Sequence, residues 1–411
     1  MRFLTCEAIA SVLWVGQAIS DRPFLSNADW EIAHASALES CVTRIAFHRF
    51  TKKLRRAPVP YFGSGRICPQ VKQHSAKLIY ATVVVLAFGT GVRAGEIGHF
   101  NGGFLNIRDF FVPAEPGFYG ALYNYYYTTD RLNDQNGNEI NDITIIPPGG
   151  GPGTTLNLDV NVDLYVVSPT VIWVPDWKPL GARCGILVAP TFASASLEAA
   201  LSRANNAGLG ASGSSWGVGD LLVQPVWLDW SSEHWDLNLS YGFYTPLGRY
   251  GTDTVTVSGI GPVKVESADN IGYGFWTQQF QGAVAWYPME NKATAVTSAL
   301  TYEINSEKED FDLTPGNALT LSWGISQYLP LKKDHSLLLE IGVAGYDSWQ
   351  TTEDSGSDAN SIKDQVHAVG GQLGVTYVPW NLVLNFHAFY EYAARDRFQG
   401  QSYGLSIAKK F

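Results

Sequence analysis

Hydrophobic and polar side chains alternate without a break along several stretches of the chain. In residues 156–164 every even position is Leu or Val and every odd position is Asn or Asp. Residues 403–411 alternate in a similar way and end on the terminal Phe411. Because successive side chains of a strand point to opposite faces, each stretch has one apolar face and one polar face. The pattern therefore predicts amphipathic β-strands.

The same alternation predicts twelve strands. They are expected at 117–128, 155–174, 181–199, 216–231, 234–247, 270–288, 293–306, 317–330, 335–351, 363–378, 380–396 and 400–411. The connections between them alternate between long and short, except for the last. Short turns at one end and long loops at the other are typical of membrane barrels, and an even strand count returns both chain ends to the periplasmic side. The predicted fold class is therefore all-β, a transmembrane up-and-down antiparallel β-barrel of about 12 strands.

Aromatic residues support a membrane barrel. Trp, Tyr and Phe together make up 13% of the chain, and many lie at predicted strand ends beside short turns, where a membrane-interface girdle is expected. Those counted as girdle residues are Trp173, Trp177, Trp227, Trp230, Trp235, Trp286, Tyr287 and Trp380. The alternative is ordinary aromatic packing in a soluble sandwich or barrel. The body contains no apolar run of 18 residues, so the sequence predicts no spanning helix.

The first 94 residues differ from the rest. They carry an excess of basic side chains, whereas the remainder is strongly acidic and the whole chain has a formal net charge of −10. A basic stretch at 71–77, an apolar run at 78–90 and small residues up to Ala94 form a secretory signal peptide, 71–94, that is too short to span a membrane. Signal peptides begin chains, so residues 1–70 are interpreted as a mis-assigned upstream extension. A genuine amino-terminal extension is the alternative.

The mature protein is expected to begin at Gly95. Residues 95–116 contain two adjacent glycines and two prolines and no alternation, which predicts an irregular segment able to plug the barrel formed by 117–411. Three of the four cysteines lie within residues 1–94, and only Cys184 lies within residues 95–411. Residues 95–411 are therefore expected to have no internal disulfide.

Several short motifs resemble those of the family named for the meta-pathway of phenol degradation. They are Gly217-Val218-Gly219-Asp220-Leu221-Leu222-Val223-Gln224-Pro225, Tyr244-Thr245-Pro246-Leu247-Gly248-Arg249-Tyr250, Pro116-Gly117-Phe118-Tyr119, Tyr125-Tyr126-Tyr127 and Phe398-Gln399-Gly400-Gln401-Ser402-Tyr403. The resemblance covers most of 99–411. It implies an outer-membrane barrel and transporter associated with the breakdown of aromatic or hydrophobic compounds. The chain departs from the family pattern at Lys409 and in its long first loop.

The glycine motif is interpreted as structural. Gly217 and Gly219 permit a tight turn at the start of a predicted strand, and Asp220 can accept hydrogen bonds from nearby backbone amides. No helix is expected to follow, so a phosphate-binding loop is not predicted.

Candidate chemical sites are weak. The first long loop offers oxygen ligands for calcium, which takes six to eight oxygens, at Asp134, Asn136, Asn138 and Asp142. It lacks the EF-hand glycine and glutamate, so a solvated loop is the favoured interpretation. His367 and His387 lie in predicted strands, as do Ser322 and Ser326, but no Gly-x-Ser-x-Gly elbow accompanies them. We therefore predict no enzyme activity, no cofactor and no metal site.

Acidic residues fall on the faces predicted to point away from lipid. With one histidine, these lumen-lining candidates are Asp159, Asp163, Glu303, Glu340, His387 and Glu391. A charge at mid-bilayer costs up to about 4 kcal/mol, so such residues should face the lumen. Fixed negative charge there would repel anions and tolerate neutral or cationic solutes. Alternatively, these carboxylates brace the barrel by pairing with Arg183, Arg395 and Arg397.

The sequence as a whole predicts an outer-membrane channel or transporter of a Gram-negative bacterium. Its solutes, from the family resemblance, are small hydrophobic or aromatic compounds that cross a narrow barrel. The expected partners are these solutes, outer-membrane lipid and the barrel assembly machinery, which would recognise Phe411; no nucleic-acid partner is expected. The alternative function is a non-conducting barrel that displays loops 129–154, 248–269 and 352–362 for adhesion or assembly.

Overall fold

The structure is a computed structural model that describes residues 98–145, 154–203, 206–257, 261–267, 269–359 and 361–411. The predicted upstream extension and signal peptide lie outside the described residues, as do positions 95–97. No helix among the described residues is both long and apolar enough to cross a membrane.

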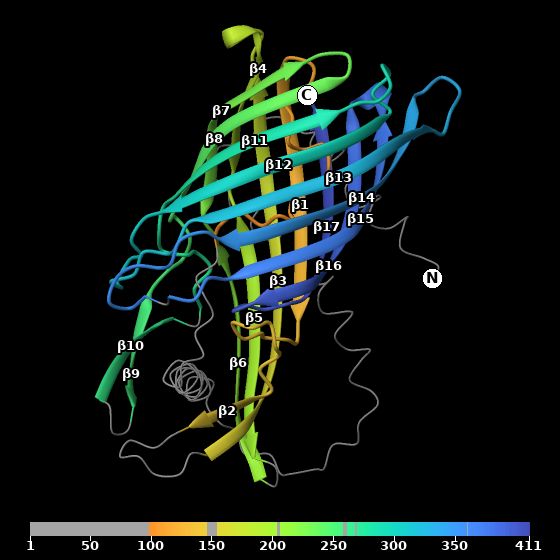
Figure 1. Cartoon of the computed structure of the whole chain (residues 1–411). Coiled ribbons are helices and arrows are strands. Elements are labelled where there is room, and N and C mark those ends of the chain that lie inside the picture. Colours follow the sequence, from red (N-terminus) through yellow and green to blue (C-terminus); the bar gives the residue numbers. More distant parts are fainter. Residues whose placement is uncertain (1–97, 146–153, 204–205, 258–260, 268, 360) are drawn as a thin grey trace, which may run out of the picture. The chain divides into compact units, whose positions relative to one another are not determined.

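Twelve antiparallel strands of the described chain close into a barrel. They are β1 (Gly117–Thr129), β3 (Thr154–Val174), β4 (Arg183–Ala189), β7 (Leu221–Ser231), β8 (Trp235–Thr245), β11 (Thr277–Trp286), β12 (Thr294–Asn305), β13 (Ala318–Pro330), β14 (Leu337–Gln350), β15 (Gln365–Tyr377), β16 (Leu382–Arg395) and β17 (Gln401–Lys410). Their order is β1–β17–β16–β15–β14–β13–β12–β11–β8–β7–β4–β3, and β3 pairs with β1 to complete the ring (Figure 1). The predicted fold class is confirmed.

Five further strands are described: β2 (Asp142–Ile145), β5 (Phe192–Arg203), β6 (Asn206–Val218), β9 (Thr252–Val257) and β10 (Gly261–Glu266). The start of β5 still belongs to the wall, because it pairs with residues 162–167 of β3, which pair with β1 on their other side. β5 and β6 form a hairpin along the first half of β3, β2 pairs with the start of β3, and β9 pairs with β10. All five project on the side away from the carboxy terminus (Figure 1).

Two predicted strands are each divided in the structure. The stretch expected at 181–199 breaks between β4 and β5 at Pro190, and the stretch at 216–231 breaks between β6 and β7 at Gly219. Proline has no backbone N–H to donate to a ladder, and glycine weakens a strand interior. The predicted loop 200–215 is therefore mostly a paired hairpin that continues beyond the barrel.

The two ends of the barrel differ as predicted. Short connections at 232–234, 287–293, 331–336 and 378–381 lie at one end, the last containing the 3₁₀ turn η3 (Val378–Trp380); the link from β3 to β4 at this end contains η2 (Pro179–Gly181). The carboxy terminus lies at this end too, where the Phe411 backbone N–H donates to the Phe118 carbonyl at 2.9 Å. The longer connections lie at the opposite end, together with the short link 396–400 between β16 and β17.

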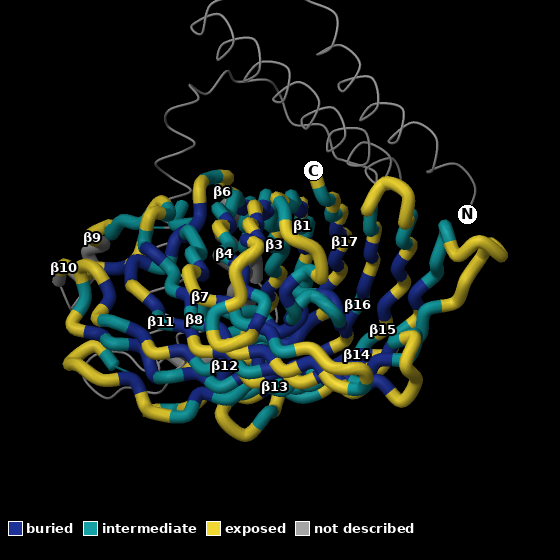
Figure 2. The backbone as a smooth tube through the Cα atoms, turned by 90° about the horizontal axis from the view of Figure 1, so that it is seen from above, coloured by how far each residue is buried: buried dark blue, intermediate teal, exposed yellow. Residues whose placement is uncertain are grey.

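The strands present an apolar outer wall and a polar or small-residue inner wall. Along β12 and β13, Leu300 and Ile325 are exposed on the outside, whereas Ala299, Thr301 and Ser322 are buried inside. Burial alternates along the strands accordingly (Figure 2). Because lipid removes any chance of solvating a polar side chain, this division is the one a membrane barrel requires.

The predicted aromatic girdle is correct only in part. Trp173, Trp235 and Trp286 are exposed on the outer wall near the short turns. Trp227 and Tyr287 are instead buried and face inward, and the Trp227 indole N–H donates to the Phe110 carbonyl at 3.2 Å. An indole needs a partner for its N–H when buried, and the chain inside the barrel supplies it.

That internal chain is residues 98–116, hereafter the internal segment. It contains no strand, and its apolar side chains pack against small residues of the inner wall. Ile107 packs near Ala344, and Phe110 packs against Ala283 and Ala299. The hydrophobic core therefore lies between the internal segment and the inside of the barrel.

Candidate functional site

The internal segment runs through the barrel from one end to the other. Near its start, His99 Nδ1 lies 2.8 Å from the Thr277 hydroxyl, where β11 begins at the end with long loops. Near its finish, the Glu115 carboxylate accepts a hydrogen bond from Lys410 Nζ at 2.6 Å, at the end with short turns. The internal segment therefore spans the barrel between its two ends.

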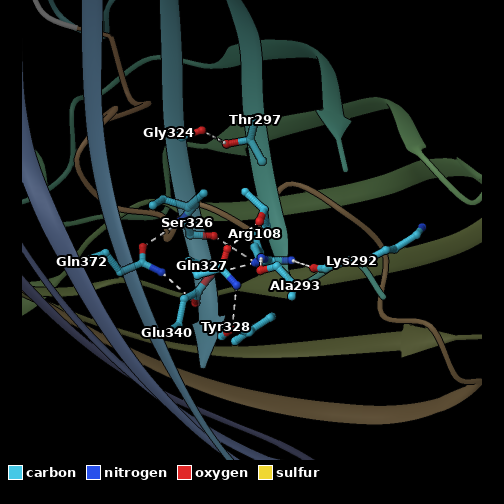
Figure 3. A network of polar contacts seen from close by, with 12 residues as sticks. Arg108, Lys292, Ala293, Thr297, Gly324, Ser326, Gln327, Tyr328, Glu340 and Gln372 are labelled. Atoms are coloured by element: carbon cyan, nitrogen blue, oxygen red, sulfur yellow. Dashed lines mark hydrogen bonds and ion pairs between the residues drawn. The ribbon is translucent and has the colours of Figure 1, made fainter. Parts of the chain in front are cut away.

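Arg108 makes the most extensive polar contacts between the internal segment and the wall (Figure 3). Its guanidinium donates to Glu340 Oε1 at 2.7 Å and to the carbonyls of Lys292 and Ala293 at 3.2 and 3.0 Å. The guanidinium carbon also lies 4.2 Å from the ring centroid of Tyr328. Buried charges are stable only when paired and hydrogen-bonded, and Arg108 meets both conditions.

Glu340 is held from a second side as well. Gln372 Nε2 donates to Glu340 Oε2 at 3.1 Å, while Gln372 Oε1 accepts the backbone N–H of Ile107 at 2.9 Å. The glutamine therefore bridges the wall to the residue next to Arg108. Together, Arg108, Glu340 and Gln372 fix the middle of the internal segment to β14 and β15.

A neighbouring buried network centres on Asn106. Its amide nitrogen donates to Asp109 Oδ2 at 2.6 Å and to the Ser406 hydroxyl at 2.8 Å, and its amide oxygen lies 3.0 Å from His387 Nδ1. Tyr123 also donates to the Asp109 carboxylate, at 3.1 Å. These contacts join the internal segment to β1, β16 and β17.

Carboxylates also hold the start of the internal segment, at the end of the barrel with long loops. Glu303 Oε1 accepts the backbone N–H of Phe100 at 2.8 Å. Asp220 accepts the backbone N–H groups of Gly248 and Tyr273 at 2.9 and 2.8 Å, and its Oδ2 lies 2.9 Å from His99 Nε2. The glycine motif therefore joins the two ends of the connection between β8 and β11, at Gly248 and Tyr273, to the residue that precedes β7.

Glu391 forms a further internal carboxylate site. It accepts hydrogen bonds from the hydroxyls of Tyr127 and Tyr346, each at 2.9 Å, and from the Gly400 backbone N–H at 2.6 Å. Both tyrosines lie on the inner wall. Glu391 therefore braces the wall itself and not the internal segment.

The candidate lumen residues separate into two groups. Glu303, Glu340, His387 and Glu391 are buried and point inward. Asp159 and Asp163 lie on the outer face instead: Asp163 pairs with Thr128 and accepts a hydrogen bond from Tyr126, which faces outward. Residues 154–161 extend beyond β1 and pair with β2 and β5, so water and not the lumen meets their polar face. The expectation for these two aspartates is corrected.

The three arginines expected to pair with the candidate lumen carboxylates are placed differently. Arg183 pairs with Asp229 at 2.5 Å, and Arg397 pairs with Asp364 at 2.8 Å, whereas Arg395 is exposed. Burial raises the pKa of Asp364, and the Arg397 guanidinium opposes that shift. The arginines therefore neutralise aspartates that the sequence did not single out.

The candidate calcium loop is closed by its own backbone. Asp134 Oδ1 accepts the backbone N–H groups of Asn136 and Asn138, both at 2.8 Å. The Asn138 backbone contact is the main reason that the pKa of Asp134 is lowered. Within the described ranges, no cluster of three or more His, Cys, Asp or Glu side chains is suited to a metal ion. Asp134, Asn136 and Asn138 therefore share one turn, whereas Asp142 begins β2 and pairs with Asn157.

The histidines and serines considered for catalysis are bonded elsewhere. His367 pairs with Asp347 at 2.7 Å on the outer wall, whereas His387 contacts Asn106 inside the barrel. Ser326 accepts a hydrogen bond from Arg108 at 3.1 Å. The Ser322 hydroxyl is buried and, among the described residues, has no hydrogen-bond partner, so it is not paired with a histidine.

Sequence reasoning missed His99, Asn106 and Arg108. The available signal was a charged pair, Arg108 and Asp109, between apolar residues in a segment expected to enter the lumen. A charge placed there has to find a partner on the wall.

Replacing Asp159 and Asp163 together by Asn is expected to leave ion selectivity unchanged, because both lie outside the barrel interior. The measurement is the reversal potential across a planar bilayer under a salt gradient. A loss of cation preference in this double variant would show that the register of β3 described here is incorrect.

Gly404→Ala is expected to destabilise the barrel by about 1–3 kcal/mol, the usual cost of overpacking. A Cβ at Gly404 would collide with the His387 imidazole on the adjacent strand. The matched control is Gly371→Ala, where a Cβ on the outer wall would meet only the Gly342 carbonyl oxygen, at 3.6 Å. Urea unfolding in detergent micelles measures both, and equal stability of the two variants would contradict the described packing.

The chain is similar to one protein family and to several solved outer-membrane structures. The model of a family described as the MetA-pathway of phenol degradation matches residues 129–407. No curated protein sequence matches the chain. Among solved structures, the COG4313 outer membrane channel from Pseudomonas putida F1 is 16% identical, with a TM-score of 0.49 over 75% of this chain and 100% of that one. The CymD monoaromatic hydrocarbon channel is 11% identical, with a TM-score of 0.35 over 79% and 97%. The β domain of the Bordetella autotransporter Brka is also 11% identical, with a TM-score of 0.39 over 72% and 100%.

Proposed function

The chain belongs to the family described as the MetA-pathway of phenol degradation, and from this premise we propose that it is an outer-membrane channel for small aromatic or hydrophobic compounds. The observation that carries the proposal is a closed twelve-stranded barrel whose interior holds a segment of its own chain. The proposal includes no catalytic step. The barrel acts by binding and passage alone.

The internal segment is proposed to be the plug that restricts passage. It contributes no strand to the ring, since β1 and β3 close the barrel on each other. Its contacts with the wall are side-chain hydrogen bonds, ion pairs and packing, such as the Arg108–Glu340 pair. Displacing the segment therefore breaks no ladder of the wall, and this displacement would open the route.

Aromatic side chains inside the barrel support an aromatic solute. Phe104 of the internal segment lies 5.5 Å from the ring of Tyr123 and 5.8 Å from that of Tyr125, both on the inner wall. Nearby, the rings of Tyr346 and Phe389 are 5.5 Å apart. Aromatic rings attract one another beyond simple area burial, so these walls would favour a flat ring over an aliphatic solute of equal size.

The mature chain is proposed to start at Gly95, after cleavage of the signal peptide 71–94, with residues 1–70 absent. Gly98, the first described residue, lies inside the barrel beside Glu303 and Ala318. Amino-terminal sequencing of protein from the outer membrane tests this, and any residue before Gly95 would contradict it. Phe411 is proposed to guide insertion by the barrel assembly machinery.

Planar-bilayer recording tests the channel directly. Purified protein should give discrete current steps, and a monoaromatic solute should reduce the current by occupying the same path. The rival function, display of loops for adhesion or assembly, is favoured by the projecting hairpins β5–β6 and β9–β10. It predicts no current steps from the wild-type protein or from a variant without the internal segment.

A further inference from the structure

The His99 side chain occupies a slot walled by aromatic rings. Its imidazole is stacked on Tyr244 with ring centroids 4.6 Å apart and an interplanar angle of 19°. The rings of Tyr273 and Phe275 approach it at 4.7 and 5.0 Å in tilted and edge-on orientations. The side chain of His99 is only 3% exposed. The slot therefore fits one flat ring.

Hydrogen-bond acceptors meet both edges of that ring. Asp220 Oδ2 lies 2.9 Å from Nε2, and the Thr277 hydroxyl oxygen lies 2.8 Å from Nδ1. Asn305 fixes the role of this hydroxyl: its amide nitrogen donates to the Gly316 carbonyl, so its amide oxygen accepts the Thr277 proton at 2.6 Å. Thr277 is then left as an acceptor toward His99.

The slot belongs to the wall and its loops and does not depend on His99. Tyr244 lies at the end of β8, and Tyr273 and Phe275 precede β11. Asp220 is held by the backbone N–H groups of Gly248 and Tyr273. These contacts remain when the internal segment withdraws, so the aromatic walls and the carboxylate would then face the lumen.

We propose that His99 stands in for the solute: its slot takes a planar aromatic ring that carries a hydrogen-bond donor, of the phenol class, with the donor pointing to Asp220. The proposal rests on the proposed function and names its solute class more narrowly. A buried acceptor left without a donor is costly, so a site of this kind rejects a ring that lacks one. Toluene, with a methyl group in place of the hydroxyl, should therefore bind more weakly than phenol.

The test uses His99→Gly in the otherwise complete purified barrel, with heat-modifiable migration on gels as the check of folding. Calorimetric titration with imidazole, phenol and toluene should show that imidazole and phenol bind, and that phenol binds at least about tenfold more tightly than toluene, the preference expected from one hydrogen bond to a charged acceptor. His99→Ala replaces the glycine variant if the latter does not fold.

Two controls isolate the slot. Wild-type protein should bind phenol more weakly than the His99 variant, because its own imidazole competes for the site. Phe110→Ala removes a ring of the internal segment that packs against Ala283 and Ala299, and should show no preference for phenol over toluene. Equal affinity for the two solutes in the His99 variant, or no binding of either, would overturn the inference.

The outcome is independent of transport. Phenol binding in a barrel that never conducts would support the slot and reject the channel. Conduction of aromatic solutes without phenol preference in the His99 variant would reject the slot and keep the channel.

Discussion

Deleting Gly95–Ala114 is expected to raise the single-channel conductance several-fold while leaving the barrel folded. The wall closes through the β1–β3 ladder without help from the internal segment, so its removal empties the lumen. Barrels of eight strands are filled by side chains and those of 16–18 hold an aqueous channel, so about twelve strands leave a narrow pore once cleared. Planar-bilayer recording measures the increase, and heat-modifiable migration reports folding.

The matched control removes chain outside the ring. Shortening the β9–β10 hairpin, whose strands pair only with each other, should leave conductance near the wild-type value. Unchanged conductance after deletion of Gly95–Ala114, in protein that still migrates as a folded barrel, would mean that the internal segment does not limit the pore.

Arg108→Ala is expected to release the internal segment without opening the wall. Removing one partner of a buried ion pair costs about 3–5 kcal/mol, because Glu340 would remain buried without its cation. Since every 1.4 kcal/mol is tenfold, the released fraction should rise by roughly a hundredfold or more. The measurement is open probability in planar bilayers.

Two variants check the origin of this effect. Arg131→Ala removes an arginine of the first loop that lies 3.9 Å from Glu139 in a partly exposed pair, and should change nothing measurable. Adding Glu340→Gln to Arg108→Ala removes the unpaired carboxylate charge of Glu340 and should restore part of the fraction of closed channels. An open probability that stays at the wild-type level in Arg108→Ala would show that the pair does not hold the internal segment.

The barrel was predictable because lipid imposes a strict rule on its wall. Positions such as Leu321 and Ile325 must be apolar, while Ser322 and Ser326 are free to be polar, and the resulting period of two marks each strand. The family motifs around Asp220 were also correctly interpreted as structural, since the carboxylate accepts backbone N–H groups. The sequence did not reveal that these N–H groups belong to Gly248 and Tyr273, which lie 28 and 53 residues from Asp220 along the chain.

The side to which each residue of β3 points could not be predicted from the sequence. Alternation indicates that Asp159 and Val160 face opposite ways, but not which way each faces. Only pairing of Thr128 with Asp163 assigns the face, and pairing is a long-range contact. The contacts of the internal segment could not be predicted for the same reason. Arg108 and Glu340 are 232 residues apart, and no local pattern links them.

The most direct test of the central claim is uptake of a labelled monoaromatic compound by intact cells whose barrel carries Gly103→Cys and Ser402→Cys. A Cβ at Gly103 would lie 3.2 Å from Ser402 Oγ on β17, which places the two sulfurs within reach of a disulfide. Native Cys184 is replaced by Ser, and Gly103→Cys alone is the control. Oxidation is expected to lower initial uptake to that of cells without the protein, and a reductant should restore it. Uptake that continues unchanged with the disulfide formed would show that the solute does not need the internal segment to move.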